Sequence, residues 1–151
     1  MFDPATIANV RLRRLYDYWD AKRGNRPMPA RADIDPVELA WGLGDISLID
    51  VLPDGDFQWR VDGSNLVAFF GCDMSGRKLS TYPYRGYLEQ MRENFRMPVE
   101  RREPVFQTRK FEDGEHRWNY DTVFLPLSAD GRKVDMVMQM IDIGRPNATR
   151  D

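Results

Sequence analysis

One histidine and one cysteine limit the chemistry that this sequence can perform. His116 and Cys72 are the sole residues of their types among 151. A single histidine excludes a two-histidine metal site and a triad built on a second histidine. A single cysteine excludes an intramolecular disulfide and a cysteine-rich zinc site. We therefore expect no metal centre in this protein.

Two pairs of acidic residues have a spacing that also occurs in general acid and base pairs. Asp33 and Asp35 stand two residues apart, but Pro36 follows Asp35 directly, which is typical of a helix N-cap. Asp54 and Asp56 flank a glycine, which indicates a turn. The sequence also lacks a phosphate-binding Gly-x-x-x-x-Gly-Lys loop and a Gly-x-Ser-x-Gly nucleophile motif. We expect the protein not to be an enzyme.

Aromatic residues supply a better candidate for a binding site. Residues 57–61 and 116–124 alternate as strands, and helical segments carry further large side chains. Side chains from both sources could line a cavity: Trp59, Phe69, Tyr87, Met91, Trp118 and Tyr120. The two interpretations left open are a filled core and a ligand pocket. A pocket would need an inward polar group; alternation turns Arg117 and Asn119 away from Trp118, which leaves Gln139.

Composition restricts the class of protein. Lys and Arg total 22 and Asp and Glu total 24, for a net charge of −2, which argues against a nucleic-acid-binding protein. A hydrophobic content of 42% is enough for the core of one domain. No apolar run approaches the roughly 18 residues of a transmembrane helix, and the first residues do not form a secretory signal. We expect a cytoplasmic protein without a transmembrane segment.

The N-terminal segment predicts an amphipathic helix. Asp3 and Pro4 have the residue types of an N-cap and a first helical position, and Gly24 ends the pattern. The apolar positions fall on one side of the helix: Ala8, Leu12, Leu15, Tyr16 and Trp19. The opposite side carries Arg11, Arg13 and Arg14. This basic side is either a solvated face or a docking surface for an acidic partner or anionic lipid.

The rest of the chain alternates between strand and helix patterns. We predict strands at 46–51, 57–61, 105–111, 116–124 and 134–143. Between the second and third strands, Ser64 or Asn65 caps a short helix that Gly71 ends, and a longer helix runs over 84–97, where Pro98 ends or interrupts it. The last strand is apolar on both faces and needs cover on both. The order predicts an α+β fold: a five-stranded antiparallel sheet with helices inserted between strands 2 and 3.

Several motifs in this order are shared with a known family. The quoted segments are Leu15-Tyr16-x-Tyr18-Trp19, Arg23-Gly24-x-Arg26, Pro29-x-Arg31-x-Asp33-Ile34-Asp35-Pro36, Phe57-x-Trp59-Arg60-Val61 and Phe70-Gly71-x-Asp73-Met74-Ser75-Gly76-Arg77. Over residues 12–143 the chain resembles a bacterial family of single-domain PAS-like proteins. The resemblance implies one domain over residues 1–151, with a helical cap at 1–24 and a PAS core at about 45–143.

The resemblance also implies a function. It indicates a stand-alone sensory or regulatory module that acts through protein–protein interaction in signal transduction. A homodimer through the N-terminal helix and a partner from a histidine kinase pathway are expected. The alternative is a small-molecule-binding protein without a signalling partner.

Known PAS cofactors can be compared with the available residues. Haem would need an axial ligand on the helical side of the pocket, whereas His116 begins a strand. A covalent flavin would need a cysteine in an Asn-Cys-Arg-Phe-like helix, whereas Cys72 lies in Gly71-Cys72-Asp73-Met74. The sequence therefore disfavours haem and covalent flavin. No cofactor is predicted, and a non-covalent small ligand of unidentified chemistry is the remaining expectation.

Overall fold

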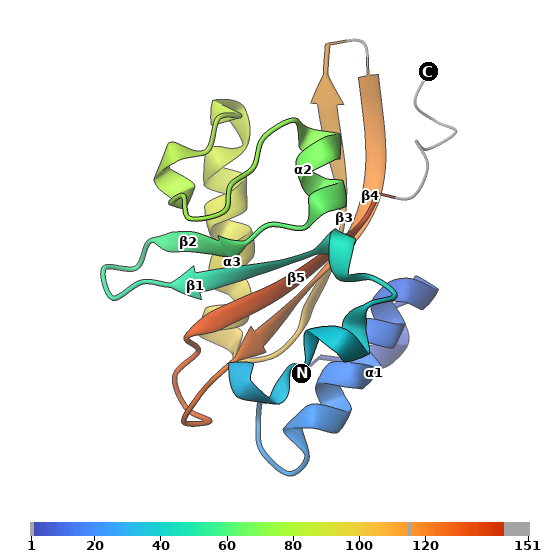
Figure 1. Ribbon diagram of the computed structural model, residues 1–151, viewed down its shortest axis with the longest axis vertical. Coiled ribbons are helices and arrows are strands. Elements are labelled where there is room, and N and C mark those ends of the chain that lie inside the picture. Colours follow the sequence, from blue (N-terminus) through green and yellow to red (C-terminus); the bar gives the residue numbers. More distant parts are fainter. Residues whose placement is uncertain (1, 115, 144–151) are drawn as a thin grey trace.

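The computed structural model describes residues 2–114 and 116–143 (Figure 1). For residues 111, 113 and 116–118 the description covers the backbone alone. The helices are α1 (Val10–Arg23), α2 (Ser64–Phe70) and α3 (Leu88–Arg101). The strands are β1 (Ile46–Val51), β2 (Phe57–Val61), β3 (Val105–Asp113), β4 (His116–Leu127) and β5 (Met136–Asp142). Short 3-10 turns at 4–6, 31–33, 36–39, 43–45, 79–81 and 85–87 connect them.

The five strands form one antiparallel sheet in the order β2-β1-β5-β4-β3. The helices α2 and α3 lie between β2 and β3 in the chain, so the predicted fold class is confirmed. β1 and β2 match their predicted boundaries, because alternation and the turn residues between them are local signals. β3 and β4 extend beyond the prediction, since each continues to pair with its neighbour past the alternating segment.

The central strand β5 is buried on both faces. Six of its seven residues are buried, so two layers must cover it. The helix α1 contacts β4 and β5 on one face, where Arg11 and Met140 both approach Gly42. The helices α2 and α3 lie over the opposite face, to which Gln139 and Ile141 belong (Figure 1). The predicted covering role of the N-terminal helix is therefore confirmed.

The start of α1 differs from the prediction. Asp3 does cap a helical turn, but that turn is a 3-10 turn and ends at Thr6. The α-helix begins after Asn9, whose side-chain oxygen accepts from the backbone N–H groups of Arg11 and Leu12. The amide nitrogen of Asn9 donates to Asp142 at 2.8 Å, which fixes the helix start to the sheet. Ala8 therefore lies outside the helix.

The basic residues of α1 have partners within the chain. The Arg11 guanidinium pairs with Asp45 at 2.7 Å and with Asp142 at 3.3 Å. Arg13 pairs with Asp17 at 3.2 Å, one turn further along the helix. The Arg14 guanidinium lies 4.2 Å from the centre of the Trp41 ring. These contacts favour a structural role for the basic side of α1.

Two helix boundaries on the other face are also corrected. The N-cap of α2 is Gly63, and neither Ser64 nor Asn65 caps the helix. Position 63 has no room for a side chain, because a Cβ there would lie 2.4 Å from the carbonyl oxygen of Gly44. The helix α3 begins at Leu88 and passes through Pro98 to Arg101. Phe95 and Pro98 are both buried, and this packing offsets the backbone hydrogen bond that proline cannot donate.

Trp19 provides a stability test of the contact between α1 and the sheet. Its side chain is 3% exposed, and its indole nitrogen donates to the carbonyl oxygen of Pro126 at 2.8 Å. Trp19→Ala should lower the free energy of unfolding by about 3–5 kcal/mol through the cavity it leaves. Val10→Ala is the matched control, because Val10 lies on the same helix and is 82% exposed. Denaturant unfolding measures both, and equal midpoints for Trp19→Ala and the parent would contradict this packing.

Candidate functional site

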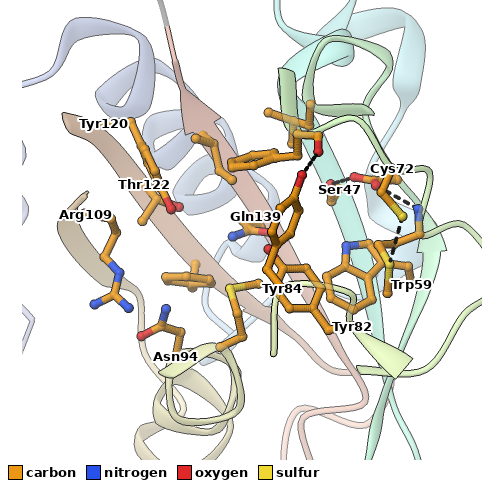
Figure 2. A pocket seen from close by; sticks show the side chains of 17 residues that line it. Ser47, Trp59, Cys72, Tyr82, Tyr84, Asn94, Arg109, Tyr120, Thr122 and Gln139 are labelled. Atoms are coloured by element: carbon orange, nitrogen blue, oxygen red, sulfur yellow. Dashed lines mark hydrogen bonds between the residues drawn. The ribbon is translucent and has the colours of Figure 1, made fainter. Parts of the chain in front are cut away.

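A partly enclosed cavity lies between the sheet and the helices α2 and α3 (Figure 2). Its volume is about 40 Å³, which is room for a few water molecules or a small organic molecule. The sheet contributes Ser47, Trp59, Arg109, Tyr120, Thr122, Phe124, Gln139 and Ile141. The helices and connecting segments contribute Asp62, Leu66, Phe70, Cys72, Met74, Tyr82, Tyr84, Met91 and Asn94.

Strand register brings the lining residues of the sheet together. Gln139 of β5 stands between Ser47 of β1 and Phe124 of β4. Along the same face of the sheet, Arg109 of β3 stands opposite Tyr120 of β4. Because side chains two residues apart share a face, these positions all belong to the cavity side.

Aromatic side chains form the apolar wall. Phe95 of α3 is fully buried, and its ring centre lies 5.4 Å from that of Trp59 and 5.9 Å from that of Phe124. The rings of Trp59 and Tyr82 stack at 6.0 Å. Such aromatic clusters are rigid and close-packed. These rings form a close-packed cluster, and three of them, Trp59, Tyr82 and Phe124, also line the cavity.

Gln139 is a buried polar residue without a partner. Its side chain is 4% exposed and lines the cavity. Among residues 2–114 and 116–143, no hydrogen bond to its amide is found, whereas the neighbouring Thr122 hydroxyl donates to the Met140 carbonyl at 3.0 Å. An unsatisfied buried amide costs about 1–3 kcal/mol, so such a group indicates a binding function or bound water.

At one side of the cavity, Arg109 lies against Asn94 (Figure 2). In the amide orientation that satisfies both of its polar atoms, the Asn94 oxygen accepts from the Arg109 guanidinium at 2.9 Å. The Asn94 nitrogen then donates to the side-chain oxygen of Gln107 at 3.1 Å. Asn94 is 2% exposed, so this contact fixes the guanidinium at the boundary between β3 and α3. No carboxylate of the described chain forms an ion pair with Arg109.

The other side of the cavity carries an acid whose oxygens are both engaged. The Ser47 hydroxyl donates to one oxygen of Asp62 at 2.8 Å, and the backbone N–H of Met74 donates to the other at 3.1 Å. Burial raises the pKa of Asp62, and these hydrogen bonds oppose the shift. Asp62 thus connects β1 to the segment that follows α2.

The tyrosines of the cavity are neutral hydrogen-bonding groups. Burial raises the pKa of Tyr120 to about 12, although the positive charge of Arg109 acts in the opposite direction. Burial also raises the pKa of Tyr82. The hydroxyl of Tyr84 donates to the backbone oxygen of Phe70, which closes the cavity between α2 and the segment before α3 (Figure 2).

The six residues predicted from the sequence are distributed unevenly. Trp59, Met91 and Tyr120 line the cavity. Phe69 and Tyr87 are not among its lining residues: the Phe69 ring packs on Phe70 at 4.8 Å, and the Tyr87 hydroxyl accepts from the backbone N–H of Glu112 at 3.2 Å. The side chain of Trp118 lies outside the described part of the chain. Ligand binding by any of them stays a prediction.

Sequence reasoning did not identify Arg109 or Asn94. The Asp113–Gly114 turn could have indicated Arg109, because a short loop at this turn places Arg109 opposite Tyr120 in the strand register. No comparable local signal existed for Asn94, which sits on an amphipathic helix at a position that the sequence does not mark. Gln139, identified as the remaining candidate for an inward polar group, does line the cavity.

The described residues contain no obvious holder for a metal or large cofactor. No group of three or more His, Cys, Asp and Glu suited to a metal occurs within residues 2–114 and 116–143. The Cys72 thiol lines the cavity, and its sulfur accepts from Arg77 at 3.5 Å. A volume of about 40 Å³ is too small for haem or flavin without rearrangement. Over the same residues, no helix has the length and apolar character to cross a membrane.

Comparisons with known proteins concern the whole domain. The sequence model of a family described as PAS domain matches residues 7–141. No curated protein matches the sequence. The PAS domain of the histidine kinase ThkA is similar in structure, at 24% identity over 64% of this chain and 97% of that chain, with a TM-score of 0.45. A PAS domain of a protein from Colwellia psychrerythraea is similar at 10% identity over 73% and 98%, with a TM-score of 0.48.

The raised pKa of Asp62 can be measured directly. In a carbon-13 NMR titration, the midpoint of Asp62 should lie above its ordinary value of 3.8, because burial disfavours the charged form. Asp130 is the matched comparison: backbone N–H groups of Arg132 and Lys133 lower its pKa to about 2. The folded state binds the Asp62 proton at a higher pH than the unfolded chain. Its contribution to stability is therefore complete below the ordinary pKa and is lost as pH rises through the folded pKa. A midpoint at or below 3.8 would contradict this.

Proposed function

The chain belongs to the PAS domain family, and from this premise we propose that it is a sensory module of signal transduction whose cavity holds a small ligand. The observation that carries the proposal is the cavity itself. It combines an aromatic wall with a few polar groups, and one of these, Gln139, is buried with no hydrogen-bond partner for its amide among the described residues. Pockets of this composition are typical of small-molecule sites.

The cavity is well placed to convert binding into a change at the surface. Its lining comes from all five strands on one side and from α2, α3 and the segment 72–84 on the other. A ligand that contacts both sides favours the arrangement in which they lie closest together. Any resulting shift in the helices depends on the difference in affinity between the two arrangements.

The output of the module is proposed to be a protein–protein interaction. A partner that reads the position of α2 or α3 would respond to occupancy of the cavity. A component of a histidine kinase pathway is the expected partner. The proposal further holds that the module acts in the cytoplasm and has no catalytic activity of its own.

The proposed homodimer would use surfaces other than the apolar side of α1. Leu12 and Leu15 are fully buried within one chain, so they pack on the sheet and are not available to a second copy. Two large apolar side chains are exposed instead: Val10 on the same helix, at 82%, and Val37 in the 3-10 turn at 36–39, at 81%. Light scattering over a concentration series would determine the oligomeric state.

The ligand-binding part of the proposal predicts a specific effect of filling the cavity. A metabolite extract or compound set should raise the melting temperature of the parent protein, and Met91→Trp should abolish the shift because the larger side chain occupies the cavity. Met97→Trp is the matched control: Met97 lies on the same helix but outside the cavity lining, where its sulfur contacts Gln107. Thermal unfolding followed by fluorescence measures all three proteins.

Native mass spectrometry of freshly purified protein gives the independent readout. A mass above that of the chain, lost in Met91→Trp and kept in Met97→Trp, supports a ligand in this cavity. If no compound changes melting and no extra mass is found, the ligand-sensing part of the proposal is wrong. A retained ligand with no partner recovered from the native cells would favour the alternative, a binding protein without a signalling partner.

A further inference from the structure

The chemistry of the cavity restricts its ligand. We propose, on the premise that the cavity is a ligand site, that the ligand is a small carboxylate that carries a second oxygen, such as a short hydroxy or oxo acid. Arg109 binds the carboxylate, and the amide of Gln139 donates to the second oxygen. The short carbon chain between them contacts the aromatic wall.

The positive charge of Arg109 favours a carboxylate as the ligand. Its guanidinium lines the cavity, and no described carboxylate pairs with it. Within the described residues its hydrogen-bond partner is a neutral amide, that of Asn94, and this contact leaves other N–H donors of the guanidinium available. The paired N–H donors of a guanidinium match the spacing of the two oxygens of a carboxylate. An ion pair between these groups is stronger in a partly desolvated site.

Asp62, the acid of the cavity, already has hydrogen-bond partners within the chain. Both oxygens of Asp62 accept hydrogen bonds from within the chain, one from Ser47 and one from Met74. Ser47 lies on the opposite side of the cavity from Arg109 (Figure 2). Uncharged donors thus satisfy the oxygens of Asp62, whereas the Arg109 guanidinium keeps N–H donors available at the cavity, which favours an anionic ligand over a cationic one.

The position of Gln139 indicates a second polar group on the ligand. The residue is 4% exposed and lines the same cavity, and its amide has no hydrogen-bond partner in the described chain. It belongs to β5, whereas Arg109 belongs to β3, with β4 between them. One molecule that satisfies both groups must therefore have two polar ends. The uncharged amide of Gln139 can donate a hydrogen bond to a neutral oxygen or accept one from a hydroxyl.

The size of the cavity sets the length of the carbon chain. A volume of about 40 Å³ in a partly open cavity suits a short-chain molecule and is too small for a long fatty acid in this arrangement. Trp59, Phe124 and Tyr84 surround the space, so the middle of the ligand meets apolar surface. Asn94 is a positioning residue, since it orients the guanidinium.

The test uses 2-, 3- and 4-hydroxybutyrate as probes, with the matching hydroxybutyramides and butyrate as controls. Calorimetric titration of the full chain should show the tightest isomer binding at least about tenfold more strongly than its amide, because the amide lacks the charge that pairs with Arg109. Butyrate should bind several-fold more weakly than that isomer, because it leaves Gln139 unpaired.

Variants assign these differences to the two residues. Arg109→Gln should remove the preference for carboxylate over amide, and Arg109→Lys should keep part of it. Gln139→Met should remove the preference for hydroxybutyrate over butyrate and should not lower the melting temperature of the free protein, because it replaces an unpaired amide by an apolar group. Arg92→Gln is the control: Arg92 lies on α3 beside Glu89, outside the cavity lining. NMR shifts of the Arg109 and Gln139 side-chain N–H signals on titration locate the probe.

Three outcomes would overturn the inference. The first is equal binding of the carboxylates and their amides, which would leave a neutral-ligand sensor and the proposed function intact. The second is that inorganic phosphate binds as tightly as the best hydroxybutyrate with the same dependence on Arg109, which would make the site a general anion site. The third is that none of the probes binds while other compounds still shift the melting temperature of the parent but not of Met91→Trp. Failure of the proposed function is distinct, since it requires that no compound at all binds the cavity.

Discussion

The central strand β5 is the constraint on which the rest of the structure depends. Its residues are apolar on both faces with two exceptions, Gln139 in the middle and Asp142 at the end. A strand of this kind is stable only when both faces are covered. The helix α1 covers one face through Leu12, Leu15 and Trp19, and α2 and α3 cover the other. The N-terminal segment is therefore a structural layer of this domain.

The cavity lies over the polar residue in the middle of that strand. Gln139 stands in the middle of the sheet, with Ser47 and Phe124 beside it, so the helices above it cover an amide as well as apolar side chains. Phe95 fills the space next to it and packs against Trp59 and Phe124. The polar groups of the two sides then remain separate: Arg109 with Asn94 on one, Asp62 with Ser47 on the other. A site of this kind costs stability, which is typical of a functional site.

The contacts that bound the cavity also connect the two layers. Asn94 joins α3 to β3 through Arg109 and Gln107, and Asp62 joins β1 to the segment after α2. Tyr84 joins that region to α2 through the backbone of Phe70. The links of Asn94 and Asp62 run from the sheet or its edge to a covering element, and that of Tyr84 joins two covering segments. A molecule that replaces or strengthens one of them changes the relative stability of two arrangements of the helices, which is the physical requirement for sensing.

The sequence by itself determined the positions of the strands along the chain, their antiparallel sheet and the need to cover both faces of β5. Alternation over 57–61 and 116–124, the turn glycines and the apolar character of 134–143 are local signals that survive folding. It also identified Trp59, Met91 and Tyr120 as lining residues and Gln139 as a candidate for an inward polar group, and all four line the cavity. The tertiary structure decided the start of α1 at Asn9, whose amide needs Asp142 from the far end of the chain, and the continuation of α3 through Pro98. It alone placed Arg109 against Asn94, because that contact depends on the register of β3 and on the position of α3 over the sheet, both of which are set by residues distant in the chain.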